Sequence, residues 1–137
     1  MNTLVIDGSA ALSLALPDES SALAQRLADA LVQGVPAFVP THWSLEVTNG
    51  ILMAERRKRI SPADAAAAIN VLRQLPIAAD GETASRAFAE GPGIARQYGL
   101  TSYDAAYLEL AMRRQSALAT LDRPMREAAV AAGVPLF

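Results

Sequence analysis

Short apolar runs alternate along this chain with longer segments in which apolar residues recur at helical spacing. The runs at 3–6, 35–40, 77–79 and 117–121 have the length of strands, and 134–137 is expected to be a closing edge strand. Strands that alternate with helices form a mostly parallel sheet covered on both faces. The sequence therefore predicts one domain, residues 1–137, with an α/β fold of three layers (α/β/α, Rossmann-like) and a small sheet.

Helical patterns fill the intervals between these runs. They cover 9–16, the stretch between the break at 17–20 and Gly34, 41 to the basic run at 56–59, 62–74, 82–98, 103–115 and 123–132. The segment 82–98 is predicted to be interrupted near Gly91-Pro92-Gly93, because proline removes a backbone donor. With 29 alanines and seven aromatic residues, the composition favours closely packed helices over a β-sandwich.

The scarcity of cysteine and histidine excludes several kinds of active site. The chain has no cysteine, which excludes thiolate zinc sites and a cysteine nucleophile, and its single histidine, His42, excludes sites built from several imidazoles. Any metal must therefore be held by oxygen atoms, which favours hard ions such as Mg²⁺ or Mn²⁺. Because no apolar run has the length of a membrane span and Met1-Asn2-Thr3 carries no positive segment of a signal peptide, we expect a cytoplasmic protein.

Four acidic residues stand where an open α/β sheet gathers its site, at strand ends and in early helical turns. Asp7 and Asp122 close the runs 3–6 and 117–121, Glu46 lies early in an apolar helix, and Asp104 ends a Thr-Ser-Tyr-Asp motif ahead of another. Each has an ordinary interpretation as well: a turn or capping aspartate, a surface glutamate, or a capping-box acid. Asn49 shares a helix face with Glu46 and could orient it.

Four carboxylates that lie close together need a compensating cation. Two unit charges about 4 Å apart repel by roughly 4 kcal/mol at an effective dielectric of 20. Either some of the acids are protonated or a divalent ion is bound, and with at most one imidazole in reach the ion is the better explanation. Such a site suits phosphoryl chemistry, because the metal neutralises phosphate oxygens and lowers the pKa of bound water so that hydroxide can attack.

Four segments around these acids resemble the PIN domain, specifically toxin ribonucleases of the VapC type. The segments are TLVIDGSAAL, SLEVTNGIL, LTSYDAAYLELA and LATLDRPMREAA, and their acids follow the family's order at separations of 39, 58 and 18 residues. The resemblance implies a metal-dependent endoribonuclease in which Mg²⁺ or Mn²⁺ is held by Asp7, Glu46, Asp104 and Asp122. It implies supporting roles for Ser9, Asn49 and Thr120. It also implies an RNA substrate, a cognate antitoxin of the VapB type that blocks the site, and a homodimer.

The overall charge is unexpected for a protein that cuts RNA, because the formal net charge is −2 and the pI is about 5.3. Neutralising the four acids leaves −2 + 4 = +2, and the remaining cations cluster at 56–59, at 113–114, and at 123 with 126. Arg56, Arg57 and Arg123 are candidate RNA contacts. For the run 56–59, a solvated helix end is an equally good interpretation.

The aromatic residues near the acids are interpreted as packing residues. Trp43 is expected in the core or at a dimer interface, and Tyr103 and Tyr107 are expected to be packing residues, although Tyr103, beside Asp104, could approach a substrate. His42 is expected to be a helix N-terminal residue and no acid-base catalyst. The small number of aromatic residues also argues against a broad platform for stacking bases.

Other phosphate-handling families match less well. A haloacid-dehalogenase-type phosphatase needs a second aspartate where this chain has Ser9, and a receiver domain needs a lysine after a late strand, whereas the only lysine here is Lys58. A PIN-like module that binds RNA or a protein without cutting, and a stand-alone RNA-processing or DNA nuclease, remain as alternatives. Our hypothesis is that the acids position one or two Mg²⁺ ions for in-line attack by water, which leaves 5′-phosphate ends.

Overall fold

Four parallel strands form a single sheet in the computed structural model of the chain, which describes residues 2–137. The strands are β1 (Leu4–Ile6), β2 (Ala37–Val39), β3 (Ile77–Ala79) and β4 (Ala117–Ala119), in the spatial order β3-β2-β1-β4. In β1, Leu4 aligns with Ala37 on one side and with Ala117 on the other. All residues of β1 and β4 are buried, as expected for strands that are covered on both faces.

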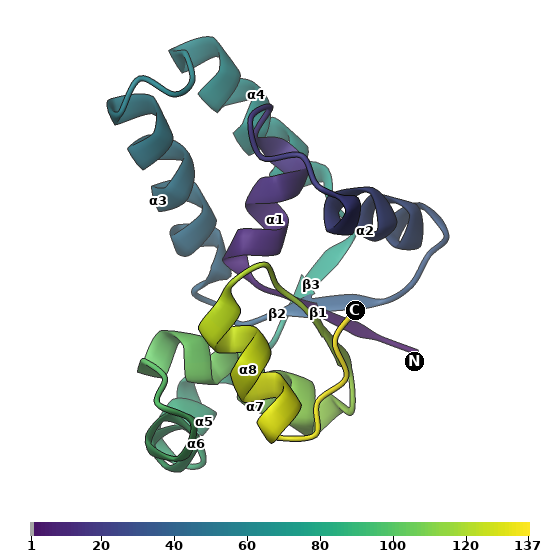
Figure 1. Cartoon of the computed structure of the whole chain (residues 1–137), viewed down its shortest axis with the longest axis vertical. Helices are drawn as coiled ribbons and strands as arrows, with labels where there is room; N and C mark the ends of the chain where they lie inside the picture. The colour runs from purple at the N-terminus through teal and green to yellow at the C-terminus, as the bar shows by residue number, and fades with distance from the viewer. Residues whose placement is uncertain (1) are drawn as a thin grey trace.

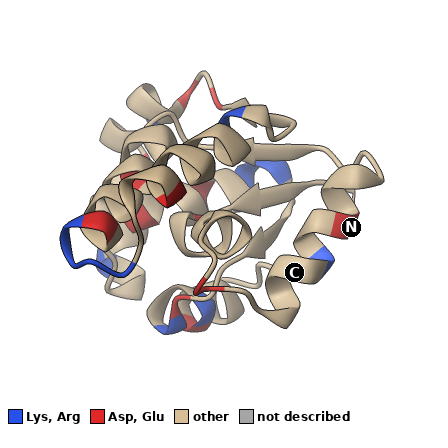
Figure 2. Ribbon diagram, turned by 90° about the horizontal axis from the view of Figure 1, so that it is seen from above, with Lys and Arg blue, Asp and Glu red and all other residues tan. Residues whose placement is uncertain are grey.

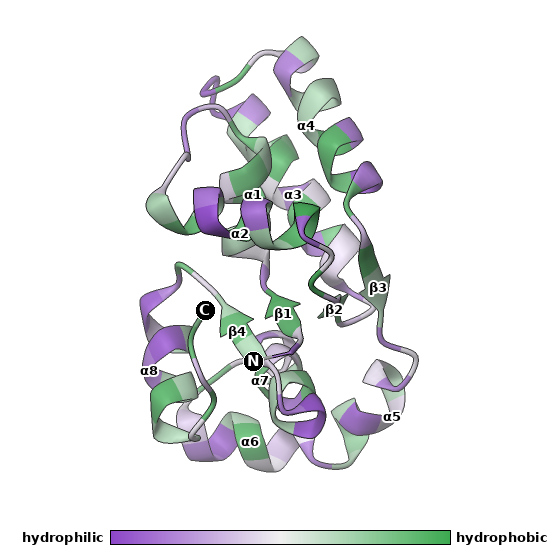
Figure 3. Ribbon diagram, turned by 90° about the vertical axis from the view of Figure 1, so that its right-hand side faces the viewer, coloured by the Kyte–Doolittle hydropathy of each residue, from purple (hydrophilic) through white to green (hydrophobic). Residues whose placement is uncertain are grey.

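Two helical layers cover this sheet, as Figures 1 and 3 show. One face carries α1 (Gly8–Ala15), α2 (Ala22–Val32), α3 (Trp43–Arg56) and α4 (Pro62–Gln74), and the other carries α5 (Thr83–Phe88), α6 (Gly91–Tyr98), α7 (Ser102–Arg114) and α8 (Arg123–Ala131). The three-layer α/β fold and the parallel sheet are therefore confirmed. Among residues 2–137, no helix has both the length and the apolar character that crossing a bilayer requires.

Small residues let the helices of the first layer approach one another closely. A Cβ atom at Gly50 of α3 would lie 2.6 Å from Leu12 Cδ1 of α1, so glycine permits this contact. The core continues through the sheet to α7, where Tyr107, Leu108 and Leu110 are buried against β1 and β4. Close packing of α1 and α3 matters for function because both helices begin beside strand ends.

Three boundaries differ from the sequence-based expectation. The run 134–137 forms only an isolated bridge between Leu118 and Leu136, because Pro135 has no amide hydrogen to extend the pairing. In 82–98 the break falls at 89–90, ahead of Gly91-Pro92-Gly93, which forms the first turn of α6, where proline is tolerated. The helix expected from residue 41 begins at Trp43, after a turn.

Candidate active site

The candidate site lies at the carboxyl ends of β1 and β4, which are neighbours in the sheet. The helices that follow these two strands lie on opposite faces, α1 on one and α8 on the other (Figure 1). A parallel α/β sheet opens a crevice where successive connections diverge in this way. Asp7 follows β1 directly and Asp122 follows β4 by three residues, so both acids stand at this edge of the sheet.

Asp7 is buried, with an exposed fraction of 5%, and its carboxylate is fully engaged. Oδ1 accepts hydrogen bonds from Ser9 Oγ at 2.7 Å and from the Ala10 amide at 2.9 Å, and Oδ2 accepts one from the Thr120 hydroxyl. Burial raises the pKa of the Asp7 carboxyl, and these three hydrogen bonds oppose that rise. Asp7 is therefore a helix cap, as its ordinary interpretation predicts, and also a buried carboxylate held in one orientation.

Ser9 and Thr120 connect the two strand ends. Ser9 Oγ accepts from the Leu121 amide at 2.9 Å, and Thr120 Oγ1 accepts from the Asp122 amide at 3.0 Å. Asp122 caps α8 through a bond from the Met125 amide to Oδ2 at 3.1 Å, and its negative charge also raises the pKa of the Asp7 carboxyl. Two hydroxyls thus fix the backbone around Asp122 relative to the carboxylate of Asp7.

Glu46 enters the site from the first turn of α3, which follows β2, the other neighbour of β1. A Cβ atom placed on Gly8 would lie 3.7 Å from Glu46 Oε2, so this carboxylate reaches the residue that adjoins Asp7. Glu46 Oε1 lies 2.8 Å from His42 Nε2, although the pair lacks hydrogen-bond geometry. Among the described residues, Oε1 is a buried oxygen without a hydrogen-bond partner.

Asp104 lies in the first turn of α7 and makes only half of the predicted capping box. The Asp104 amide donates to Thr101 Oγ1 at 3.1 Å, but the carboxylate accepts no hydrogen bond from any residue in 2–137. The same pattern at Ser61 and Asp64 forms both bonds, at 3.1 and 3.3 Å. Burial and then the charges of Asp122, Glu46 and Asp7 raise the pKa of the Asp104 carboxyl. The negative charges of the other three acids therefore act on the Asp104 carboxyl.

A histidine and a tyrosine complete the contacts between the helices that carry these acids. His42 Nε2 lies 3.1 Å from the carbonyl oxygen of Tyr103, the residue before Asp104. The ring of Tyr107 packs edge-on against the His42 ring with centroids 5.2 Å apart, and burial followed by the charges of Glu46, Asp7 and Asp104 raises the pKa of its phenol. The Tyr107 hydroxyl has no hydrogen-bond partner in the part of the chain that is described.

The donor set suits a hard divalent cation in its chemistry, because every acidic group contributes oxygen atoms. The unpartnered Glu46 Oε1 and the unbonded Asp104 carboxylate are buried or partly buried oxygens that a cation would satisfy. Within residues 2–137, however, no three His, Asp or Glu side chains are grouped closely enough to hold a metal ion. Two of the four carboxylates accept hydrogen bonds from helix amides, Asp7 from the amide of Ala10 and Asp122 from the amide of Met125.

Several residues predicted for the site lie away from the acids. Asn49 is exposed, about one helical turn beyond Glu46, and its side chain makes no hydrogen bond within residues 2–137. Arg56 and Arg57 are at the opposite end of α3, about 15 Å from Glu46 along the axis at 1.5 Å per residue, and belong to the continuous blue segment in Figure 2. Arg123 adjoins Asp122, but its side chain is 89% exposed and pairs with Glu127 at 3.0 Å.

His42 stands at the start of α3 and Tyr107 is buried in the core, as expected, and sequence reasoning did not foresee that their rings contact each other beside Glu46. The spacing of four residues between His42 and Glu46 was the available signal, although His42 precedes the regular helix. Arg126 is also closer to the site than expected, because its Nη1 donates to the Thr120 carbonyl oxygen at 3.1 Å. These contacts join the residue before α3 to α7, and α8 to the segment that follows β4.

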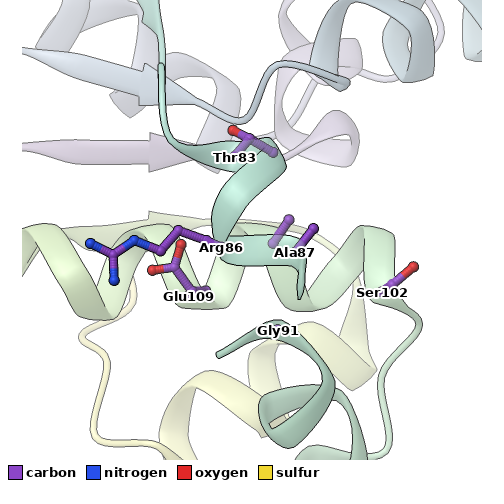
Figure 4. A pocket seen from close by; sticks show the side chains of 7 residues that line it. Thr83, Arg86, Ala87, Gly91, Ser102 and Glu109 are labelled. Carbon is purple, nitrogen blue, oxygen red and sulfur yellow. The ribbon is translucent and has the colours of Figure 1, made fainter. Parts of the chain in front are cut away.

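A separate cleft lies between α5, α6 and α7 and is lined by Thr83, Arg86, Gly91, Ser102 and Glu109, among others (Figure 4). Its charged groups already have partners. Arg86 pairs with Glu82 and Glu90 at 3.0 Å each, and Glu109 pairs with Arg113 at 2.8 Å. This cleft is therefore part of a stabilising ion-pair network and contributes no free charge to the acidic site.

Comparison with known proteins agrees with this arrangement. The sequence profile described as "PIN domain" matches residues 4–131, and the chain belongs to the PIN domain family. It is 32% identical over 128 residues to Ribonuclease VapC3 of Pyrobaculum aerophilum, covering 90% of this chain and 92% of that protein.

Two solved structures share the fold. The crystal structure of PAE2754 from Pyrobaculum aerophilum has a TM-score of 0.69 at 20% identity, covering 92% of this chain and 78% of that one. FitAcB from Neisseria gonorrhoeae has a TM-score of 0.64 at 16% identity, covering 98% and 96%. The resemblance to the PIN domain that the four acidic motifs suggested is thus confirmed.

Proposed function

We propose that this chain is a divalent-metal-dependent endoribonuclease, folded as one nuclease domain over 1–137, and the toxin of a toxin–antitoxin pair. The contact path that links the acids carries the proposal. On one side, the residue before Asp104, Tyr103, contacts His42 through its carbonyl oxygen, and His42 lies beside Glu46. Glu46 in turn lies near Gly8, the neighbour of Asp7. On the other side, the Thr120 hydroxyl donates to Asp7 and accepts from the amide of Asp122. The relative named a ribonuclease supports the RNA-cutting activity.

Asp7, Glu46, Asp104 and Asp122 are the residues that would hold Mg²⁺ or Mn²⁺. A divalent cation in such a site supplies charge neutralisation for phosphate oxygens and lowers the pKa of water. The Asp104 carboxylate accepts no hydrogen bond within residues 2–137, and Glu46 Oε1 has one close polar neighbour, His42 Nε2 at 2.8 Å, without hydrogen-bond geometry. Ser9 and Thr120 hold Asp7 in one orientation. Asn49 is proposed as a polar neighbour of Glu46 on the same helix face.

The three arginines predicted to contact RNA lie at different distances from the acids. Arg123 adjoins Asp122 and is exposed, so it is the better placed of the predicted RNA contacts. Arg56 and Arg57, about 15 Å along α3 from Glu46, would meet only a more distant part of a long RNA. An antitoxin of the VapB type, a homodimer and a cytoplasmic location follow from the same proposal and rest on the family resemblance.

The test is cleavage of structured RNAs by the purified protein, with Mg²⁺ or with EDTA, and with DNA of the same sequences alongside. We expect RNA fragments with 5′-phosphate ends in Mg²⁺, no cleavage in EDTA, and none by Glu46→Gln. Cleavage of DNA alone would favour the DNA nuclease, and binding of RNA without cleavage would favour the non-cutting module. Cleavage by Glu46→Gln at the wild-type rate would refute the assignment of the site.

A further inference from the structure

The single histidine joins the two helices that bring Glu46 and Asp104 to the site. His42 is the residue immediately before α3, and its Nε2 atom has two oxygen neighbours, Glu46 Oε1 at 2.8 Å and the Tyr103 carbonyl oxygen at 3.1 Å. One neighbour belongs to α3 and the other to α7. The His42 side chain is 21% exposed, so its environment is largely protein.

The identity of these neighbours fixes the proton on the ring. A carboxylate oxygen and a carbonyl oxygen are both acceptors, so an unprotonated Nε2 would place three lone pairs against one another. A hydrogen on Nε2 converts both contacts from repulsive to attractive, because it donates to the Tyr103 carbonyl and lies beside the negative Glu46 Oε1. The surroundings therefore select the form of His42 that carries its proton on Nε2.

The ring itself is held in place from the α7 side. Tyr107 packs edge-on at a centroid distance of 5.2 Å and Tyr103 lies at 6.0 Å with a tilted geometry. Tyr107 is buried, with an exposed fraction of 1%, so the ring of His42 rests on a fixed part of the core. The imidazole can therefore transmit the position of α7 to the carboxylate of Glu46.

We infer that His42 is a positioning residue for the acidic site, which ties the first turn of α3 to the first turn of α7 through its Nε2–H group. This inference rests on the proposed function, because it assigns to His42 the alignment of two of the four acids that would hold the cation. Groups that orient a metal ligand in this way commonly change metal affinity or activity by about 10-fold to 100-fold when they are replaced.

The first test uses the metal-free protein, in which ¹⁵N-labelled histidine gives signals from one residue only. At pH 8.5 we expect a visible Nε2–H cross-peak, because an exposed imidazole N–H exchanges with water too fast to be detected. In Glu46→Gln this cross-peak is expected to move, since one oxygen neighbour of Nε2 loses its charge. Absence of the cross-peak, a pattern typical of the Nδ1–H form, or an unchanged position in Glu46→Gln would overturn the inference.

The second test compares His42→Gln, whose amide nitrogen can replace Nε2–H, with His42→Ala, which has no donor. We expect His42→Ala to bind Mn²⁺ about 10-fold more weakly than the wild type, measured by the electron paramagnetic resonance signal of free Mn²⁺. His42→Gln is expected to retain affinity within about threefold of the wild type. Equal weakening in both variants at equal melting temperature would mean that ring packing, and not the donor, matters.

The two tests separate this inference from the proposed nuclease activity. If the wild type neither binds Mn²⁺ nor cuts RNA, the proposed function fails, and the cross-peak experiment alone decides the placement of His42. If the wild type binds Mn²⁺ and cuts RNA while His42→Ala does both equally well, the proposed function stands and the role of His42 is refuted.

Discussion

At the scale of single residues, Asp7 combines a structural role with an energetic penalty. Its carboxylate caps α1 and accepts three hydrogen bonds, yet burial raises its pKa above the ordinary value. A carboxyl with a raised folded-state pKa destabilises the folded protein at neutral pH relative to a neutral group of the same shape, and protonation at lower pH removes that penalty. Such a charge is retained at a cost in stability, which is the behaviour expected of a functional group.

Replacing Asp7 with Asn tests this interpretation. Asparagine is as good an N-cap as aspartate and carries no charge, so we expect the free energy of unfolding at pH 7 to stay within about 1 kcal/mol of the wild type or to rise. RNA cleavage is expected to be lost. Urea unfolding followed by circular dichroism measures the first effect and a gel assay the second. A loss of several kcal/mol would show that Asp7 is mainly structural.

Asp104 and Asp64 form a matched pair, because both end the pattern [Ser/Thr]-x-x-Asp at a helix start. We expect Asp104→Asn to lower cleavage about 100-fold or more with little change in stability, since its carboxylate bonds to no helix donor. Asp64→Asn keeps a side-chain oxygen that can accept the reciprocal bond from the Ser61 amide, and it is expected to cost about 1 kcal/mol or less while cleavage continues. Equal activity in the two variants would contradict the assignment of Asp104.

This pair also shows what the sequence could predict about the site. Local patterns located all four acids at strand ends or first helical turns, because capping and strand termination leave clear signals. They could not distinguish Asp104 from Asp64, since the difference lies in which side chains α7 faces across the fold. The contact between His42 and Tyr103 could not be foreseen for the same reason, because it joins residues 61 positions apart.

At the scale of elements, helix starts were predicted well and strand ends less well. Ser61, Thr101 and Asp122 cap helices where the sequence indicated, because each supplies an oxygen to an unpaired amide. The run 134–137 resembled a strand in composition but pairs only at Leu136, since pairing depends on the partner strand and on Pro135. Contacts with the neighbouring strand, and not the intrinsic β propensity of the residues, therefore decide where strand pairing ends.

The largest ion-pair network stabilises the junction of β3, α5 and α7. Arg113 of α7 binds Asp80 at 2.8 Å, Glu109 at 2.8 Å and Glu82 at 3.2 Å, and both Asp80 and Glu109 are buried. The Thr83 hydroxyl bridges Asp80 to the backbone of Thr41, just ahead of His42. The Arg113 guanidinium thus holds together elements that lead into the first turn of α3, which carries Glu46.

We expect Arg113→Met to destabilise the protein by about 3–5 kcal/mol, because it leaves buried carboxylates unpaired. Arg123→Met, which removes an exposed pair with Glu127, is the control for stability and should change it by less than about 1 kcal/mol. Urea unfolding at pH 7 measures both. A loss of less than about 1 kcal/mol in Arg113→Met would show that the network is not structural.

The same network predicts a dependence of stability on pH. Hydrogen bonds from Arg113 lower the pKa of the Asp80 carboxyl below its ordinary value. A lowered folded-state pKa contributes stability that is present above the unfolded value of about 3.9 and is lost as the pH falls through the folded value. The contribution of Asp80 should therefore begin to decline below about pH 4 in the wild type and be lost below its folded-state pKa, and Asp80→Asn should show a flatter acid limb in urea titrations.

At the scale of the whole molecule, the fold brings together acids that are far apart in sequence. The sheet order β3-β2-β1-β4 puts β1 between β2 and β4. The helices α1 and α3 from one layer and α8 from the other therefore begin near the same edge of the sheet, and α7 lies in the layer of α8. The alternation of strands and helices predicted this architecture, because parallel strands require crossovers that cover both faces. It could not predict the spacing of the carboxylates, which in the described residues is too wide for a preformed metal site.

Metal binding should therefore stabilise the whole molecule by relieving repulsion that the fold creates. A ligand that binds only the folded state adds about 2.7 kcal/mol at 100 times its dissociation constant. For a chain of 137 residues this should raise the melting temperature by several degrees in millimolar Mg²⁺ or Mn²⁺, measured by calorimetry against EDTA. Asp104→Asn, which removes one of the four charges and one ligand, should show a much smaller increase. An equal rise in melting temperature in Asp104→Asn would mean that the metal ion binds elsewhere, because a metal ion held by Asp104 must stabilise the folded protein less when that carboxylate is removed.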